Sequence, residues 1–91
     1  MALIRQQTPN PNALKFILPQ KMFDAPRSFP SAESASGDPL AARIFSTGAI
    51  YNVFMVQDFI TVNKLPHVDW EPLATEIEQT VAEHFNLETT D

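Results

Sequence analysis

Hydrophobic and polar residues alternate along residues 13–18, where Leu14, Phe16 and Leu18 fall on one side of an extended chain. A short run at residues 2–7 precedes this segment, and a turn rich in proline and asparagine separates the two. Short extended runs on either side of a turn are typical of an antiparallel hairpin. The beginning of the chain therefore predicts two paired strands.

Residues 49–64 carry the strongest strand pattern, rich in β-branched and aromatic residues. The pattern divides around Gln57 and Asp58, which predicts a second tight hairpin. In its second half Ile60 and Val62 share one side, which we expect to face inward. The first half is apolar on both sides, so either Tyr51, Val53 and Met55 or the alternate residues face the core.

Two amphipathic helices are predicted. In residues 38–48, Asp38 is a good N-cap, Pro39 suits the first helical position and Gly48 suits a left-handed end. Its apolar stripe is Leu40, Ala41, Ile44 and Phe45. In residues 67–87, Asp69 is expected to cap the helix. Its apolar side comprises Trp70, Leu73, Ala74, Ile77, Val81 and Phe85, and its solvent side Glu76, Glu78, Gln79 and Glu83.

Residues 19–37 form a long segment with three prolines and several serines, which predicts an irregular loop. Met22, Phe23 and Phe29 are expected to anchor it, and a short strand or helical turn within it is compatible with the pattern. The element order is then ββαββα. We predict a single α+β domain over residues 1–91, a two-layer sandwich in which both helices cover one face of a four-stranded antiparallel sheet.

The composition excludes several classes of function. The 91 residues include no cysteine, which excludes disulfides and thiolate ligands within the chain. A net charge of -5 with dispersed basic residues argues against a nucleic-acid partner. The apolar runs are too short for a membrane span, and the N-terminus lacks a signal pattern, so we expect a cytoplasmic protein.

The sequence offers little for catalysis or metal binding. With only Gly37 and Gly48 there is no glycine-rich phosphate loop, and no nucleophile–histidine arrangement is visible. His67, Asp69 and Glu71 alternate in a way that could present metal ligands, but the two acids also suit a helix start. We therefore expect no enzyme, and keep a weak iron-binding or metal-delivery protein as the alternative function.

The uncovered face of the predicted sheet is the remaining candidate. If Ile60 and Val62 point inward, an unusually apolar set points outward, which is typical of a binding surface. That outward set is Lys15, Ile17, Phe59, Thr61 and Asn63, joined by one side of the preceding strand, either Tyr51, Val53 and Met55 or the alternate residues.

Together three segments resemble one known family. The strings TPNPNALKF, DPLAARIF with GAIYNVFMVQDFITVNK, and a helix headed by tryptophan occur in the order seen in the N-terminal domain of Nfu/NifU-type iron–sulfur cluster scaffold proteins. Matching residues are Thr8, Pro9, Asn10, Pro11, Asn12, Lys15, Phe16, Asp58, Phe59, Ile60, Thr61, Val62 and Lys64. Related sequences often carry glycine before the acidic residue of the second hairpin, where this chain has Val56 and Gln57.

The resemblance implies a role in iron–sulfur assembly without cluster binding by this chain. In two-domain members a separate C-terminal domain with a Cys-x-x-Cys pair holds the cluster, and this sequence lacks such a pair. The function we expect is a non-catalytic adaptor that binds a client or a separate cysteine-bearing assembly protein. The expected partner-binding residues are Asn10, Asn12, Lys15, Phe59, Thr61 and Lys64, although one asparagine is expected to bond the backbone of its own turn.

Overall fold

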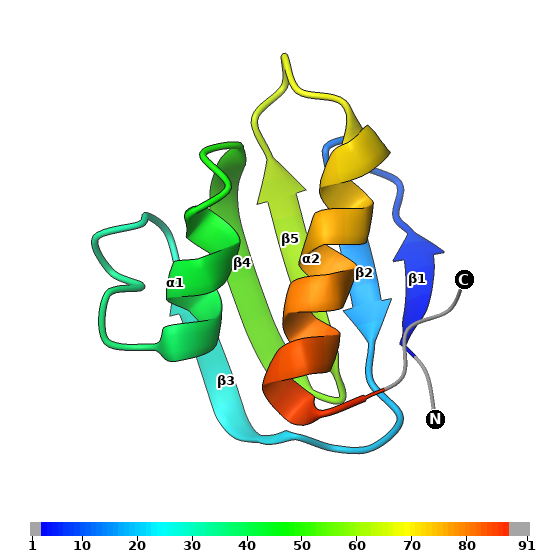
Figure 1. The fold of residues 1–91 in the computed structure, drawn as a ribbon, viewed down its shortest axis with the longest axis vertical. Coiled ribbons are helices and arrows are strands. Elements are labelled where there is room, and N and C mark those ends of the chain that lie inside the picture. Colours follow the sequence, from blue (N-terminus) through cyan, green and yellow to red (C-terminus); the bar gives the residue numbers. More distant parts are fainter. Residues whose placement is uncertain (1–2, 88–91) are drawn as a thin grey trace.

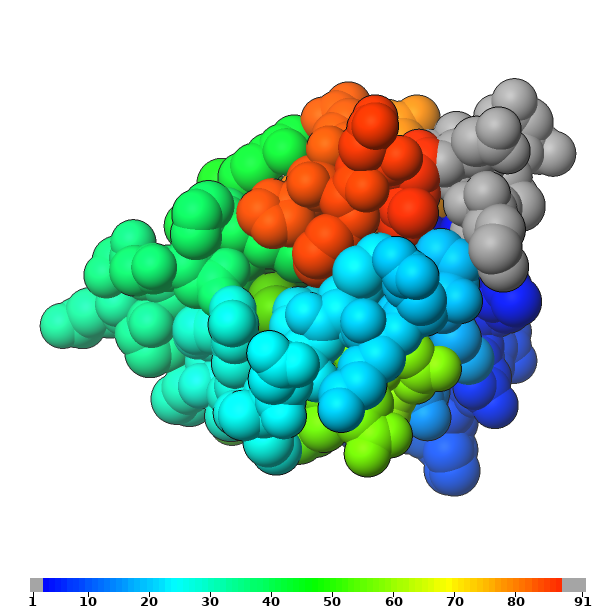
Figure 2. Space-filling view, turned by 90° about the horizontal axis from the view of Figure 1, so that it is seen from below, coloured from blue at the N-terminus to red at the C-terminus, as the bar shows by residue number. Residues whose placement is uncertain are grey.

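The computed structural model describes residues 3–87 and contains one sheet and two helices (Figure 1). In chain order the elements are β1 (Ile4–Gln7), β2 (Ala13–Ile17), β3 (Phe23–Phe29), α1 (Pro39–Phe45), β4 (Ile50–Gln57), β5 (Phe59–Lys64) and α2 (Trp70–Phe85). The sheet order is β1-β2-β5-β4-β3, and every neighbouring pair is antiparallel. Both helices lie on one face, and Figure 2 shows the two layers edge-on. The α+β class, the two hairpins and the single-sided helix layer follow the prediction.

The sheet has five strands, and the prediction of four was wrong. The additional strand is β3, which lies inside the segment predicted to be an irregular loop. It pairs with β4 through Arg27 opposite Met55 and Phe29 opposite Val53. Proline and serine obscure the strand in the sequence, but β3 is an edge strand with a register irregularity between Phe23 and Arg27, where a proline costs no sheet hydrogen bond.

The inward side of β4 is settled by packing. Val53 and Met55 are buried with Ile60 and Val62 under the helices, which leaves their neighbours for the other face. Tyr51 breaks the alternation and is 63% exposed. The reason is a register shift between Ile50 and Asn52, which inserts Tyr51 as an extra residue opposite β5.

The turn between β4 and β5 consists of Gln57 and Asp58, since Val56 pairs with Phe59. Gln57 has a positive φ of 53°, the left-handed region in which glycine is most easily placed. The predicted hairpin is therefore present, and a glutamine occupies its position of positive φ.

The helix ends agree with the sequence in one helix only. Asp38 accepts hydrogen bonds at Oδ1 from the backbone N–H groups of Leu40 and Ala41, both at 3.0 Å, and Gly48 has the expected positive φ of 78°. Asp69 was expected to cap α2, but its side chain makes no capping hydrogen bond. Glu71 has extended φ and ψ angles, so the regular helix begins only after it.

Glu78 was expected on the solvent side of α2, and that prediction was wrong because its side chain is buried. Arg5 of β1 donates from Nε to Glu78 Oε1 at 2.8 Å. Position 78 therefore faces the edge of the sheet, where a strand distant in sequence supplies a cation. This pair joins the last helix to the first strand.

Candidate functional site

The open face of the sheet presents two rows of side chains, opposite the helices. The cross-strand register places Ile4, Ile17, Phe59 and Val56 in an apolar row across β1, β2, β5 and β4. The next row is Gln6, Lys15, Thr61, Phe54 and Ser28. Ile4 is 61% exposed and Phe54 is 38% exposed. We call these two rows the open face.

Lys15 and Phe59 form the centre of the open face. The Lys15 ammonium lies 4.0 Å from the centroid of the Phe59 ring, which is a cation–π contact. Thr61 is the cross-strand partner of Lys15, and all three side chains are half-buried. Lys15 is the one charged residue in the two rows. The structure thus brings together three of the residues predicted to bind a partner.

Residues 8–12 connect β1 to β2, and we call them the Pro/Asn turn. Most polar groups of this turn form hydrogen bonds within it. Asn10 Oδ1 accepts the backbone N–H of Asn12 at 2.9 Å, the Asx-turn pattern expected for one of the two asparagines. The Thr8 hydroxyl accepts the Asn10 N–H at 3.2 Å and lies 3.0 Å from the carbonyl oxygen of Ala13. The turn is therefore held rigidly, and the side-chain oxygen of Asn10 is already engaged.

Lys64 lies away from the open face and is 7% exposed. Its ammonium donates to Asn12 Oδ1 at 3.0 Å and stands 5.8 Å from the centroid of the Trp70 ring. The same two residues are also joined through their backbones, because the Lys64 N–H donates to the Asn12 carbonyl at 2.8 Å. In this structure Lys64 and Asn12 connect the turn to the end of β5, and their role in binding a partner stays a prediction.

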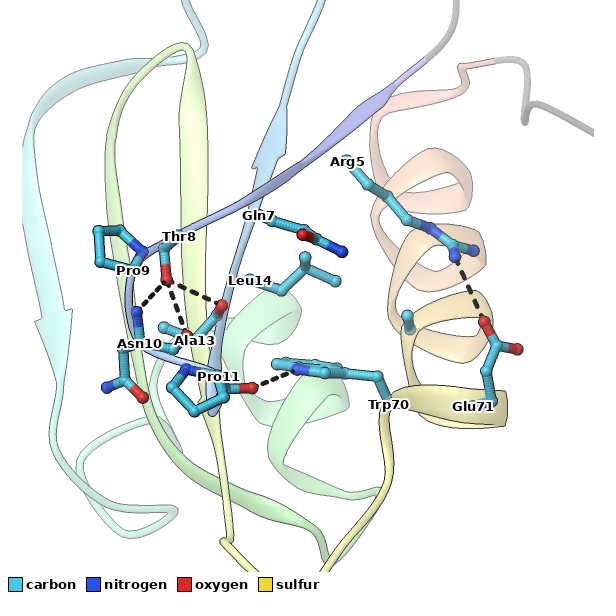
Figure 3. A pocket seen from close by; sticks show the side chains of 11 residues that line it. Arg5, Gln7, Thr8, Pro9, Asn10, Pro11, Ala13, Leu14, Trp70 and Glu71 are labelled. Carbon is cyan, nitrogen blue, oxygen red and sulfur yellow. Dashed lines mark hydrogen bonds and ion pairs between the residues drawn. The ribbon is translucent and has the colours of Figure 1, made fainter.

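A groove lies between the Pro/Asn turn and the beginning of α2, with a cavity volume of about 550 Å³ (Figure 3). Leu14 and Ala74 are buried residues that line it, and Trp70 lies along its side. The Trp70 indole N–H donates to the Pro11 carbonyl at 3.0 Å. The rim carries charges of both signs because Arg5 and Glu71 line the groove, with Nη1 and Oε1 3.9 Å apart.

In the described part of the chain, the structure brings together no set of side chains that would support the metal-binding alternative. No group of three or more histidine, cysteine, aspartate or glutamate side chains within residues 3–87 could hold a metal ion. His67 and Asp69 are exposed, and Glu71 lies near Arg5 instead. An iron–sulfur cluster also does not fit these residues, because the sequence contains no cysteine.

Anaerobic addition of iron(II) is expected to leave the imidazole resonances of His67 unchanged up to millimolar metal. Single, exposed oxygen and nitrogen ligands that do not converge bind a divalent ion only weakly. Two-dimensional NMR of the histidine side chains measures this, with His84 as the internal control for nonspecific broadening. Selective movement of His67 together with the Asp69 amide would restore the metal hypothesis.

Sequence reasoning missed Ile4 and Phe54 on the open face, and Trp70 with Arg5 in the groove. Ile4 could have been found by extending the first hairpin, because its register places Ile4 opposite Ile17. Phe54 follows by alternation once Val53 and Met55 are known to face inward. No local pattern indicates the groove, since its sides come from opposite ends of the chain.

Comparison with known proteins supports one family. The family described as "Scaffold protein Nfu/NifU N terminal" matches residues 3–88. NifU-like protein 4, mitochondrial, of Arabidopsis thaliana is 36% identical over 87 residues, which cover 94% of this chain and 31% of that protein. The human NFU1 iron-sulfur cluster scaffold homolog, mitochondrial, is 37% identical over 87 residues, 93% of this chain and 34% of that protein. The chain thus spans about a third of the length of these relatives.

Solved structures share the fold. A NifU-like protein from Saccharomyces cerevisiae matches with a TM-score of 0.82 at 23% identity, covering 94% of this chain and 79% of that one. Protein SAV1430 from Staphylococcus aureus matches with a TM-score of 0.74 at 24% identity, covering 89% of this chain and 99% of that one. Within residues 3–87 no helix is long and apolar enough to cross a membrane. The plant and human relatives are named as mitochondrial, so a cytoplasmic location stays a prediction.

Proposed function

The chain belongs to the family of Nfu/NifU scaffold-protein N-terminal domains, and on that premise we propose that it is a non-catalytic interaction module of iron–sulfur cluster assembly. Its role is to bind a partner protein, either a client that receives a cluster or an assembly protein that carries the cysteines. The thiolates that hold a cluster are supplied from outside these 91 residues, which contain no cysteine.

The observation that carries the proposal is the apolar row of the open face. Both helices lie on the other side of the sheet, so Ile4, Ile17 and Phe59 have no covering layer in the described structure. Contiguous apolar residues rimmed by polar ones are a common feature of protein interfaces. Burial of this row would supply the affinity.

The chemistry of the open face specifies its partner. Lys15 is the single charge in the two rows, and its ammonium lies over the Phe59 ring. A complementary surface is therefore apolar, with one carboxylate positioned to meet Lys15 when the contact is desolvated. On the other side of the sheet, α2 carries four glutamates, which disfavour binding of an acidic partner to the helices.

Capture of partners is expected to fail when the centre of the open face is changed. The double variant Lys15→Glu/Phe59→Ser reverses the charge and removes the ring beneath it, so binding should fall about tenfold or more. The immobilised domain is incubated with a native extract of cells from the organism that encodes it, and the captured proteins are identified and quantified by mass spectrometry. The wild type should enrich iron–sulfur proteins or their assembly factors.

The matched control is Lys21→Glu/Tyr51→Ser, which carries the same charge reversal and the same loss of an aromatic ring outside the two rows. It should capture the same proteins as the wild type. Circular dichroism and thermal unfolding establish that both double variants are folded. Equal recovery of iron–sulfur proteins by the Lys15→Glu/Phe59→Ser variant would refute the assignment of the open face.

A further inference from the structure

The two edges of the sheet differ in how they are protected. On one side β3 carries Pro26 and a register irregularity between Phe23 and Arg27, both of which obstruct the addition of another strand. On the other side β1 is a short regular strand that pairs only with β2 within the described residues. Its residues are IRQQ, and all are exposed. Natural sheets often protect an edge with proline or a bulge, and β1 has neither.

A groove lies beside β1 on one face of the sheet, and an exposed apolar side chain lies on the other face. On the helix side lies the groove with its buried floor of Leu14 and Ala74 and the Trp70 side chain (Figure 3). On the open side Ile4 projects beside Ile17. Side chains of an added strand alternate between the two faces, about 4.8 Å beyond β1. One set would reach the groove and the other would cover Ile4.

Charge indicates the composition of such a strand. Glu71 lines the groove with a side chain that is 81% exposed, and its ion pair with Arg5 is long at 3.9 Å. Arg5 is already engaged by Glu78 at 2.8 Å, which makes Arg5 a poor partner for a further acid. Asp69 is exposed nearby in sequence, and the whole chain carries a net charge of -5. A basic segment therefore complements this edge.

We propose that β1 and the adjoining groove bind an extended basic segment of a partner protein, which adds to the sheet as a further strand. Backbone hydrogen bonds to β1 supply affinity, as in other cases of strand addition. An apolar side chain enters the groove beside Gln7 and Trp70, and a lysine or arginine beside it meets Glu71. This second surface is separate from the centre of the open face and goes beyond the proposed function.

The probe is the blocked peptide acetyl-Lys-Val-Leu-Val-Lys-amide, titrated into the ¹⁵N-labelled protein. In an extended conformation its lysines and leucine face the groove while its valines face Ile4. Amide resonances of Ile4, Arg5, Gln6 and Gln7 are expected to shift, and the outward-pointing N–H groups of β1 should exchange more slowly with solvent. Shifts confined to Lys15 and Phe59 would overturn the proposal.

Backbone methylation separates strand addition from simple insertion of a side chain. Alternate peptide N–H groups point to opposite edges of a strand, so only one set pairs with β1. One peptide is methylated on both valine nitrogens, and another on the leucine and second lysine nitrogens. We expect one of them to lose affinity about tenfold or more and the other to bind within about twofold of the parent. Equal affinities, or equal losses, would overturn strand addition.

A charge test on the protein completes the experiment. Glu71→Gln should weaken the parent peptide about two- to fivefold, as expected for an exposed ion pair. Glu83→Gln on the same helix removes the same charge at a distant ion pair with Arg43 and should change nothing. Equal effects of both variants would show nonspecific attraction and overturn the assigned groove. The peptide titration tests β1, whereas the capture experiment tests Lys15 and Phe59, so failure of either proposal is recognised separately.

Discussion

Replacing Phe16 with alanine is expected to lower the free energy of unfolding by about 3–5 kcal/mol, the cost of removing a large buried aromatic side chain. Phe16 is 0% exposed and lies on the helix-facing side of β2. It sits between Arg5 on β1 and Ile60 on β5, its cross-strand neighbours. Because the interior around Phe16 is close-packed, the surrounding side chains fill only part of the cavity that the ring would leave.

The matched control for Phe16 is Phe54, the same residue type on the opposite face of the same sheet. Phe54 is 38% exposed, so Phe54→Ala should cost only about 1 kcal/mol. Urea unfolding followed by far-ultraviolet circular dichroism measures both variants. Equal losses of stability would mean that the open face is buried in solution, which contradicts the assignment of the two faces.

Trp70→Ala is expected to destabilise the domain by about 2–3 kcal/mol, less than a fully buried aromatic residue because the ring is half-exposed. The loss has two parts. The indole N–H bonds the Pro11 carbonyl at 3.0 Å, and the ring packs beside the turn and near the Lys64 ammonium. Without the indole, the Pro/Asn turn loses its direct side-chain bond to the start of α2.

Trp70→Phe separates these two parts, because it keeps an aromatic ring and removes the N–H. It should cost about 1 kcal/mol, the net value of one hydrogen bond. Circular dichroism during urea unfolding is the appropriate measurement, since Trp70 is the single tryptophan and fluorescence is lost with it. If Trp70→Phe lowers the free energy of unfolding as much as Trp70→Ala, the hydrogen bond accounts for the whole loss. That result would contradict the contribution assigned to packing of the ring.

Several parts of the fold were predictable because their signals are local. The apolar stripe of α1, the Asp38 cap and Gly48 all lie within one short segment, and each is present in the structure. The two hairpins follow from turn residues placed between runs of β-forming residues. The family was also recognisable, because the TPNPNALKF and DFITV strings stand intact in the sequence.

The errors arose where a partner distant in sequence decides the outcome. The β3 strand is formed by pairing with β4, and its own composition, with Pro26, favours a loop. Glu78 is buried because Arg5 meets it across most of the length of the chain. Similarly, Lys64 is only 7% exposed because Asn12, far away in the sequence, accepts a hydrogen bond from its ammonium. No window of neighbouring residues contains both members of these pairs.

By itself, the sequence determined the α+β class, the hairpins, the apolar stripes of the helices and the membership of the family, because periodicity and turn chemistry act over a few residues. The tertiary structure alone decided which side of β4 faces the helices, that β3 forms one edge of the sheet, and that the outer edge of β1 has no strand partner within residues 3–87. Those features depend on pairing and packing between segments that meet only after folding. The Pro/Asn turn lies between these cases: its residues predict the turn, but only Lys64 and Trp70 show what holds it in place.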